Sequence, residues 1–193
     1  MKNSKEHILA AALKCFMDKG VENTTIADIR DESSVSVGSI YHHFGNKNGI
    51  VIALFLTGVK NHSAQQEKAL AQAKTAEDGV KAVVKCYIDW IDENPDWARF
   101  VFRYRSLVEN SQQTEQHEQQ KRAHFERLRA WFYPCIARNE IKKLPFEVYH
   151  ALIIGPSQDF ALRWLAGKTK SKLSEHRELY AKAAWQAIRV AQD

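Results

Sequence analysis

The stretch that decides the fold is TTIADIRDESSVSVGSIYHHFGNK, residues 24–47. Thr24 or Thr25 can cap one short helix. After a break at residues 33–35, Ser36 can cap a second one. Two short helices joined by a turn of three or four residues form a helix-turn-helix, whose second helix fits the major groove of DNA. The stretch therefore predicts an element that reads DNA.

Outward from this stretch, apolar residues recur at spacings of three and four along the chain, and strand-like alternation is absent. A first helix from Asn3 or Ser4 to Gly20 supports the helix-turn-helix, and Asn46 caps a long helix that runs to about Ala73. We predict an all-α protein of nine helices. Two of the later helices are expected at residues 76–94 and 96–108. A further helix is expected through residues 121–136, and the Gln-rich segment before it (110–120) is either a loop or the start of that helix. The last two are expected at 145–165, with a kink at Gly155-Pro156, and from a cap near Ser174 to about Val190.

The composition is that of an ordinary globular chain, with 193 residues of which 45% are hydrophobic and 26% charged. No apolar run approaches the roughly 18 residues of a transmembrane helix, and the N-terminus is unlike a secretory signal. Cys15, Cys86 and Cys135 are far apart and form no CxxC pair. We expect reduced cysteines in a cytoplasmic protein with no membrane partner.

The net charge of +5 does not itself point to the helix-turn-helix. Residues 1–50 hold six Lys/Arg and six Asp/Glu, whereas residues 111–193 hold fourteen against nine. The proposed DNA reader is therefore formally neutral. Its phosphate contacts must come from a few well-placed cations, hydroxyl groups and helix N-termini.

The run Val-Ser-x-Gly-x-Ile-Tyr-x-x-Phe-x-x-Lys occupies residues 35–47. Together with the helix before it and the long helix after it, this run resembles the DNA-binding domain of TetR-family transcriptional regulators over about residues 4–55. Beyond residue 55 only the nine-helix architecture and the length are similar. The resemblance implies a DNA-binding domain of residues 1–47 and an effector-binding and dimerisation domain of residues 48–193.

Two positions depart from the family's pattern. The family usually has a small residue where Arg30 stands and a glycine where Ser34 closes the second helix. A serine in a left-handed turn costs about 1 kcal/mol relative to glycine. Arg30 can run its stem along the core while its charged head stays in water.

The second short helix begins with small residues that allow close approach to base edges: Ser36, Val37, Gly38 and Ser39. Gly38 costs about 1 kcal/mol against alanine inside a helix, so we interpret it as serving close approach. Relief of crowding within the protein is the alternative. Ser39 and His42 lie one turn apart and are candidates to read bases.

Three further residues are candidates to contact phosphates. The resemblance assigns this role to Tyr41 and to Lys47 at the start of the fourth helix. Thr25, at a helix N-terminus, can offer a hydroxyl and an amide to a phosphate oxygen. Without the motif, Thr25 would be only a cap and Lys47 only a solvated charge.

Aromatic residues on the inward stripes of three later helices predict a pocket for a small, largely apolar effector. The alternative is a plain hydrophobic core. The eight candidates are Tyr87, Trp90, Trp97, Phe100, Tyr104, Phe125, Trp131 and Phe132.

The last two predicted helices carry more apolar side chains than a terminal hairpin needs, with small alanines that permit close packing. The candidates for a dimer interface are Leu152, Ile153, Phe160, Trp164, Ala184, Trp185 and Ile188. The resemblance implies a four-helix bundle with a two-fold mate, which would pair two readers on a palindrome. The alternative is packing within one subunit.

These features predict a cytoplasmic transcriptional regulator that binds double-stranded operator DNA as a homodimer. We expect a repressor that a small effector releases by favouring a conformer in which the fourth helix swings. The alternative is an architectural or coregulator protein without an effector. No nucleophile–base set or phosphate-binding glycine loop is visible, so we expect neither an enzyme nor a cofactor. The paired His42 and His43 diverge by about 100° on a helix, so they predict no metal site.

Overall fold

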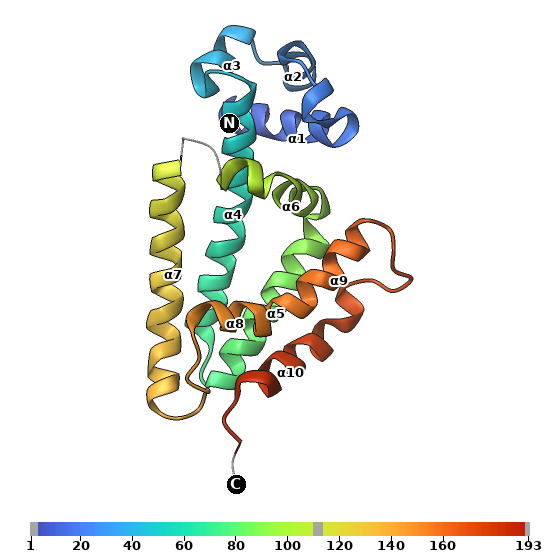
Figure 1. The fold of residues 1–193 in the computed structure, drawn as a ribbon. Helices are drawn as coiled ribbons and strands as arrows, with labels where there is room; N and C mark the ends of the chain where they lie inside the picture. Colours follow the sequence, from blue (N-terminus) through green and yellow to red (C-terminus); the bar gives the residue numbers. More distant parts are fainter. Residues whose placement is uncertain (1–3, 110–113, 192–193) are drawn as a thin grey trace. The chain divides into compact units, whose positions relative to one another are not determined.

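The computed structural model describes residues 4–109 and 114–191 (Figure 1). Within these residues the chain is helical and forms no strand beyond one isolated bridge, which confirms the all-α prediction. The helices are α1 (Ser4–Asn23), α2 (Ile26–Ser33), α3 (Val37–Phe44), α4 (Lys47–Gln72), α5 (Ala76–Glu93), α6 (Pro95–Glu109), α7 (Thr114–Ala137), α8 (Phe146–Ile153), α9 (Gly155–Leu165), a 3₁₀ turn (Ser174–His176) and α10 (Arg177–Ile188).

The chain divides into two compact units. The first comprises Met1–Lys60 and Asp96–Thr114, and the second comprises Asn61–Pro95 and Glu115–Asp193. Helix α4 begins in the first unit and continues into the second. The predicted functional boundary after residue 47 is a different division, and it remains a prediction.

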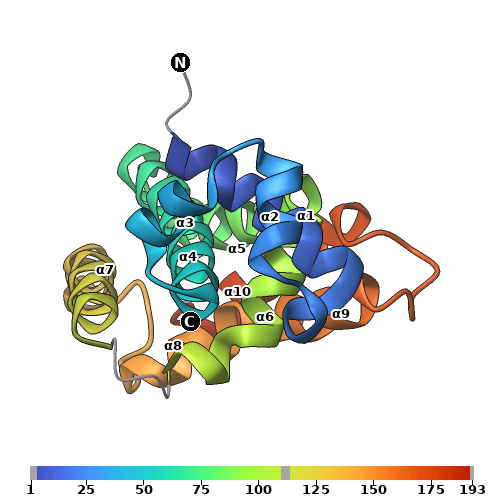
Figure 2. The ribbon, with the colours of Figure 1, turned by 90° about the horizontal axis from the view of Figure 1, so that it is seen from above.

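In the first unit α1, α2 and α3 cross one another beside the start of α4 (Figures 1 and 2). Each of these helices contributes an isoleucine or leucine that is fully or almost fully buried: Ile8, Ile29, Ile40, Ile50 and Leu54. Burying such a side chain contributes about 2 kcal/mol. The apolar spacing of the sequence thus produces one small core under the helix-turn-helix.

Side-chain caps set the starts of three helices, as the sequence predicts. The Thr25 hydroxyl accepts the amide of Asp28 at 3.1 Å at the start of α2. The Ser36 hydroxyl accepts the amide of Ser39 at 3.3 Å at the start of α3. Asn46 Oδ1 accepts an amide in the first turn of α4 at 2.9 Å. These bonds satisfy amides that have no partner within the helix, so the residue types alone locate the helix starts.

At two positions the backbone leaves the helical conformation where the sequence predicts a helix end. The helical path of α1 is broken at Gly20, which adopts φ 79° and lets the chain turn towards α2. Ser34 closes α2 in the left-handed conformation, with φ 54° and ψ 26°. The helix-turn-helix therefore keeps the turn geometry for which glycine is usual, although a serine occupies it.

In the second unit α5 packs against α8, α9 and α10, and α10 lies along α5 (Figure 1). Arg177 at the start of α10 forms a two-pronged ion pair with Asp89 of α5, with distances of 2.6 and 2.5 Å. Gly79 of α5 admits the indole of Trp131 from α7, because a Cβ atom there would lie 1.9 Å from that ring.

The nine predicted helices are close to the ten α-helices of the described residues. The single helix expected at 145–165 is wrong, because this segment forms two helices. The break falls at Ile154, which separates α8 from α9. Pro156 has no N–H and cannot continue the hydrogen-bond ladder across this point. The cap expected near Ser174 is also wrong, because Ser174 begins a 3₁₀ turn that lacks a side-chain cap bond. The predicted cap at Asn3 lies outside the described residues.

Among the helices that the structure describes, none combines the length and the apolar character needed to cross a membrane.

Candidate DNA-binding site

The outer face of α3 presents small residues at its start and an aromatic and a histidine at its end. Ser36, Gly38 and His42 are exposed, and Val37 and Ser39 are partly exposed. On the opposite side, α3 is anchored by Ile40, of which 1% is exposed, and by the half-buried Phe44. Tyr41 is 50% exposed, which leaves it accessible to a partner outside the protein.

Gly38 has no packing partner that requires a glycine. A Cβ atom built at Gly38 would meet no heavy atom within 4 Å, and the backbone there is ordinary helix. Relief of internal crowding, the alternative weighed from sequence, therefore has no support in the structure. The free space above Gly38 is what close approach to DNA would need.

Gly49, at the start of α4, is the opposite case. A Cβ atom at Gly49 would lie 2.0 Å from the carbonyl oxygen of Phe44, the last residue of α3. Real Cβ atoms do not approach a backbone oxygen so closely. Gly49 thus allows the end of α3 to rest against the first turn of α4.

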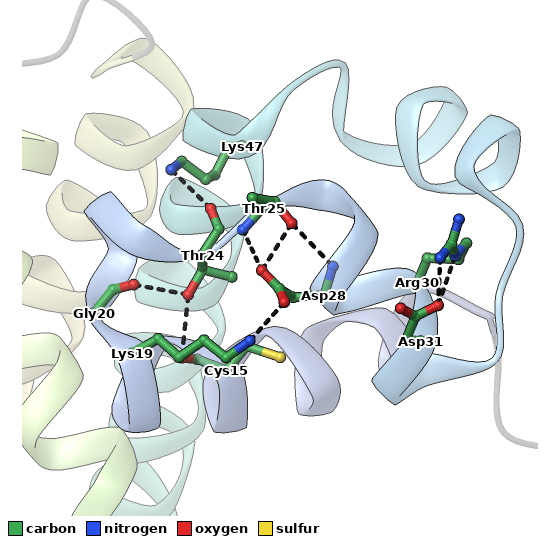
Figure 3. Close-up of polar contacts among 9 residues, drawn as sticks. All are labelled: Cys15, Lys19, Gly20, Thr24, Thr25, Asp28, Arg30, Asp31 and Lys47. Carbon is green, nitrogen blue, oxygen red and sulfur yellow. Dashed lines mark hydrogen bonds and ion pairs between the residues drawn. The ribbon is translucent and has the colours of Figure 1, made fainter.

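Thr25, a predicted phosphate contact, is engaged within the protein (Figure 3). Its amide and its hydroxyl each donate to the carboxylate of Asp28, both at 2.7 Å. Lys19 of α1 also bonds that carboxylate at 2.6 Å. Lys19 first, and then Thr25, hold the pKa of the Asp28 carboxyl well below its usual range. A phosphate at Thr25 would have to replace an anion that the protein already supplies.

Lys47, the second predicted phosphate contact, also bonds inside the protein. Its Nζ donates to the carbonyl oxygens of Val21 at 2.7 Å, Glu22 at 3.2 Å and Thr24 at 2.9 Å. Figure 3 shows the bond to Thr24. These carbonyls belong to the corner between α1 and α2, where a cation also interacts favourably with a helix C-terminus.

Three ion pairs lie within the described part of residues 1–50, the segment whose formal charges balance. They are Lys14–Glu32 (2.8 Å), Lys19–Asp28 (2.6 Å) and Arg30–Asp31 (2.6 Å). Two of them join α1 to α2. Arg30 keeps its guanidinium at the surface, as the sequence predicts, with 48% of its side chain exposed.

The eight predicted pocket residues belong to both units, and each unit has ring contacts of its own. In the first unit Phe100 stacks on Phe16 of α1, with ring centroids 6.0 Å apart, and Tyr104 lies 4.8 Å from Phe100. Trp97 lies against Gly58 of α4. The Tyr104 hydroxyl is buried and makes no hydrogen bond to any described residue.

In the second unit the pocket residues on α5 and those on α7 have different neighbours. Tyr87 and Trp90 lie against His62 of α4, with centroid distances of 5.6 and 5.4 Å. The indole N–H of Trp90 donates to Asn61 at 2.8 Å.

The α7 members of the set pack towards α8 and α5. Phe125 and Phe132 lie 5.9 and 6.4 Å from the Phe146 ring of α8. Trp131 fills the space above Gly79. An effector pocket that uses all eight residues remains a prediction. The second unit also contains a surface cavity of about 630 Å³ at the start of α5 and the ends of α7 and α10, and none of the eight residues lines it.

The predicted dimer residues fall into two groups by their exposure in the single chain. Ile153, Ala184 and Ile188 are at most 4% exposed within the single chain. The other four, Leu152, Phe160, Trp164 and Trp185, are half-buried. Two exposed leucines that the sequence reasoning missed are Leu162 on α9 (46% exposed) and Leu179 on α10 (64% exposed). For Leu179 the signal that could have indicated it is its helical phase, which is nearly opposite to that of the buried Ala181 and Ala184.

The three cysteines are free thiols, buried at Cys15 and Cys135 and partly buried at Cys86. Burial raises the pKa of the Cys86 thiol to about 11, so it stays protonated at neutral pH. Burial also raises the pKa of Cys15 and of Cys135. No three His, Cys, Asp or Glu side chains in the described part of the chain gather at metal-binding distance.

Comparisons with known proteins agree with this geometry. The family described as bacterial regulatory proteins, tetR family, matches residues 8–54. The chain is 30% identical over 95 residues to the HTH-type transcriptional repressor AcnR of Corynebacterium glutamicum, which is 49% of this chain and 45% of that protein. It is 37% identical over 79 residues to the HTH-type transcriptional regulator TtgR of Pseudomonas putida, 41% and 35% of the two chains. The chain thus matches less than half the length of these curated relatives.

Solved structures extend the likeness of fold to nearly the whole chain. A TetR-family regulator from Marinobacter aquaeolei VT8 has a TM-score of 0.80 at 18% identity and covers 97% of this chain and 96% of its own. The regulator FadR from Bacillus subtilis, solved with stearoyl-CoA, has a TM-score of 0.77 at 19% identity and covers 95% and 99%. All four of these proteins are named as transcription regulators or repressors. The chain is thus similar to the tetR family of bacterial regulatory proteins in its helix-turn-helix, over residues 8–54, and to solved TetR-family regulators in its fold.

Proposed function

We propose that this protein is a transcriptional regulator that binds double-stranded DNA through α3. The proposal rests on the structure of the outer face of α3. There, small residues and the open space above Gly38 allow a groove to approach the helix backbone. Ser39 and His42, one turn apart, are the base-reading residues in this proposal. The hydroxyl of Tyr41, a residue that is 50% exposed, is the phosphate contact in this proposal.

We infer that two copies act together on a palindromic operator. A single eight-residue helix reaches few base pairs, and two-fold pairing doubles the number that is read. The exposed Leu162 and Leu179 are the apolar side chains that α9 and α10 leave uncovered in one chain. With the half-buried Phe160 and Trp164, they form the proposed dimer face.

Repression with release by an effector is the proposed mode of action. The similar AcnR is named a repressor, and the similar FadR was solved with stearoyl-CoA. For this chain we propose a small, largely apolar effector that binds in the second unit and acts through α4, which continues into the first unit. The cytoplasm is the proposed location.

One observation favours the alternative of a DNA-binding protein without an effector. The predicted pocket residues belong to both units, and in each unit they already have aromatic or glycine neighbours of their own. Titrating the protein with stearoyl-CoA and with other apolar ligands, followed by tryptophan fluorescence, distinguishes the two. A saturable change supports the effector, whereas an unchanged spectrum across the panel favours the alternative.

The experiment that tests DNA recognition is selection of duplexes from a random-sequence pool by the wild-type protein. We expect an inverted repeat to be enriched, with half-sites about one helical turn apart. The selected duplex should then bind Tyr41→Phe and His42→Ala more weakly than wild type, while Tyr133→Phe on α7 binds normally. Enrichment of no sequence, or equal binding by all variants, would contradict the proposal.

A further inference from the structure

Lys47 makes hydrogen bonds to backbone carbonyl oxygens that its position in the sequence does not predict. Its ammonium group has three N–H donors, and the three carbonyl oxygens of Val21, Glu22 and Thr24 lie within 3.2 Å of Nζ. We call these three hydrogen bonds the Lys47 bridge. They join the first residue of α4 to the corner where α1 ends and α2 is about to begin.

Other hydrogen bonds within the protein also stabilise the corner to which Lys47 bonds. The Thr24 side chain is buried, and its hydroxyl lies 2.7 Å from the carbonyl oxygen of Gly20 and 3.1 Å from that of Cys15. The Gly20 oxygen also accepts the amide of Thr24 at 3.2 Å. The side chains of Thr24 and Lys47 thus donate hydrogen bonds to carbonyl oxygens of the last turns of α1 and of the corner that follows.

We propose that Lys47 is a positioning residue that fixes the start of α2 to the first turn of α4, and that it is not a phosphate contact. The inference rests on the proposed DNA-binding function. An ammonium that gives all three N–H groups to carbonyls has no donor left for a phosphate oxygen. Thr24 directly precedes Thr25, the cap of α2, so the bridge holds the end of α2 that would face the DNA backbone.

The bridge also gives α4 a direct connection to the DNA reader. A displacement of the first turn of α4 either breaks the three bonds or carries the corner with it. The first turn of α4 thereby helps to set the position of the corner and of the capping group of Thr25 and Asp28. A regulator that responds to an effector through α4 would use this connection.

The first test needs no DNA. Hydrogen exchange of the free protein should be compared for wild type, Lys47→Met and Lys47→Arg, with Lys60→Met as the control. Lys60 is an exposed lysine of the same helix. We expect the amides of Thr24, Thr25 and Asp28 to exchange about tenfold faster in both Lys47 variants, because local opening is easier there. The middle of α1 and the control should be unchanged. Wild-type exchange at the corner in both Lys47 variants would overturn the proposal.

The second test separates positioning from phosphate contact by the dependence of DNA binding on salt. A lost phosphate contact lowers the slope of log K against log salt concentration by about 0.9, whereas a displaced helix weakens binding at every salt concentration. The probe is the duplex selected by the wild-type protein. For Lys47→Met we expect about tenfold weaker binding with the wild-type slope.

The Lys47→Arg variant also tests whether Lys47 positions the corner or contacts a phosphate. An arginine keeps the positive charge, but its planar guanidinium cannot direct three N–H groups to these three oxygens as an ammonium does. We therefore expect Lys47→Arg to bind as weakly as Lys47→Met. Wild-type affinity in Lys47→Arg, together with a reduced slope in Lys47→Met, would show a phosphate contact and overturn the inference.

The two proposals can fail separately. If the wild-type protein selects no duplex, the proposed function fails, and the exchange experiment alone decides whether the bridge exists. Circular dichroism of each variant confirms that it has folded. If Lys47→Met does not fold, the charged Lys47→Arg variant supplies both comparisons.

Discussion

Gly38 and Gly49 stand eleven positions apart on either side of the junction between α3 and α4, and they are glycines for opposite reasons. An added Cβ atom meets nothing within 4 Å at Gly38, but lies 2.0 Å from the backbone oxygen of Phe44 at Gly49. The packing of the protein requires Gly49 and is indifferent to Gly38. A glycine that the fold does not need, on an exposed helical face, points to a partner outside the molecule.

The largest effect is expected from Gly49→Ala. The added methyl group overlaps a backbone oxygen that cannot rotate away, so α3 must move from α4, at a cost of about 1–3 kcal/mol in unfolding free energy. Urea unfolding followed by circular dichroism measures this change. The control is Asn48→Ala, an exposed neighbour that should leave stability nearly unchanged. Equal stability of the two variants would remove the contrast between the glycines.

Gly38→Ala should act in the opposite direction on the fold and weaken DNA binding. Alanine favours the helix by up to about 1 kcal/mol. The new methyl group blocks the closest approach to the groove, and we expect about tenfold weaker binding, or 1.4 kcal/mol. Thermal unfolding and a gel shift with the selected duplex measure the two effects. Gly155→Ala, where an added methyl also meets open space, is the matched control and should keep full affinity. A destabilised Gly38→Ala would mean that the fold itself needs this glycine.

Ser34 supplies a third case, a residue with a side chain in a conformation that suits glycine. Ser34→Gly should stabilise the protein by about 1 kcal/mol, because the left-handed backbone at φ 54° is strained for serine. Unfolding in urea gives the value. Ser33→Gly, one residue earlier and within α2, should be destabilised instead, since glycine is unfavourable inside a helix. The same sign for both variants would contradict the assignment of strain to Ser34.

The smallest effect is expected from Asp28→Asn, which keeps a carbonyl oxygen for Thr25 but removes the charge that Lys19 contacts. The pKa of Asp28 is depressed in the folded protein, so its stabilisation is complete above the unfolded value of 3.8 and is lost as the pH falls below it. Wild type should melt slightly above the variant at pH 7. That difference should shrink between pH 4 and pH 2, as measured by thermal scans. A difference that grows with acidity would have the wrong sign.

The sequence predicts the helix-turn-helix well because local bonds specify it. The sequence predicts caps at Thr24 or Thr25, at Ser36 and at Asn46, and the structure has caps at Thr25, Ser36 and Asn46, each bonded to an amide three residues later. The strain at Ser34 was likewise visible, since the pattern of the turn calls for a left-handed residue there. Signals of this kind depend on neighbours in the chain and need no knowledge of the tertiary structure.

The sequence could not predict contacts between distant segments. Lys47 bonds oxygens 23 to 26 residues away, and no local pattern distinguishes that arrangement from a solvated charge. Amphipathic stripes show that Phe100 and Phe132 turn inward. They do not show that Phe100 meets Phe16 of α1 while Phe132 meets α8. The same limit affects the dimer face, where Ile188 is fully buried in its own chain.

Several cations of the helix-turn-helix region are bonded to groups within the protein, and this affects how the protein finds its operator in a genome. Of the six cations in residues 1–50, Lys14, Lys19 and Arg30 are held by carboxylates, and Lys47 is held by carbonyls. Attraction to arbitrary DNA depends on cations that are available to displace counterions from the phosphates. We expect such a surface to leave non-target DNA quickly and to spend little time sliding along it. Fewer molecules are then sequestered by the many competing sites of a chromosome, and occupancy of the operator depends more on recognition than on charge.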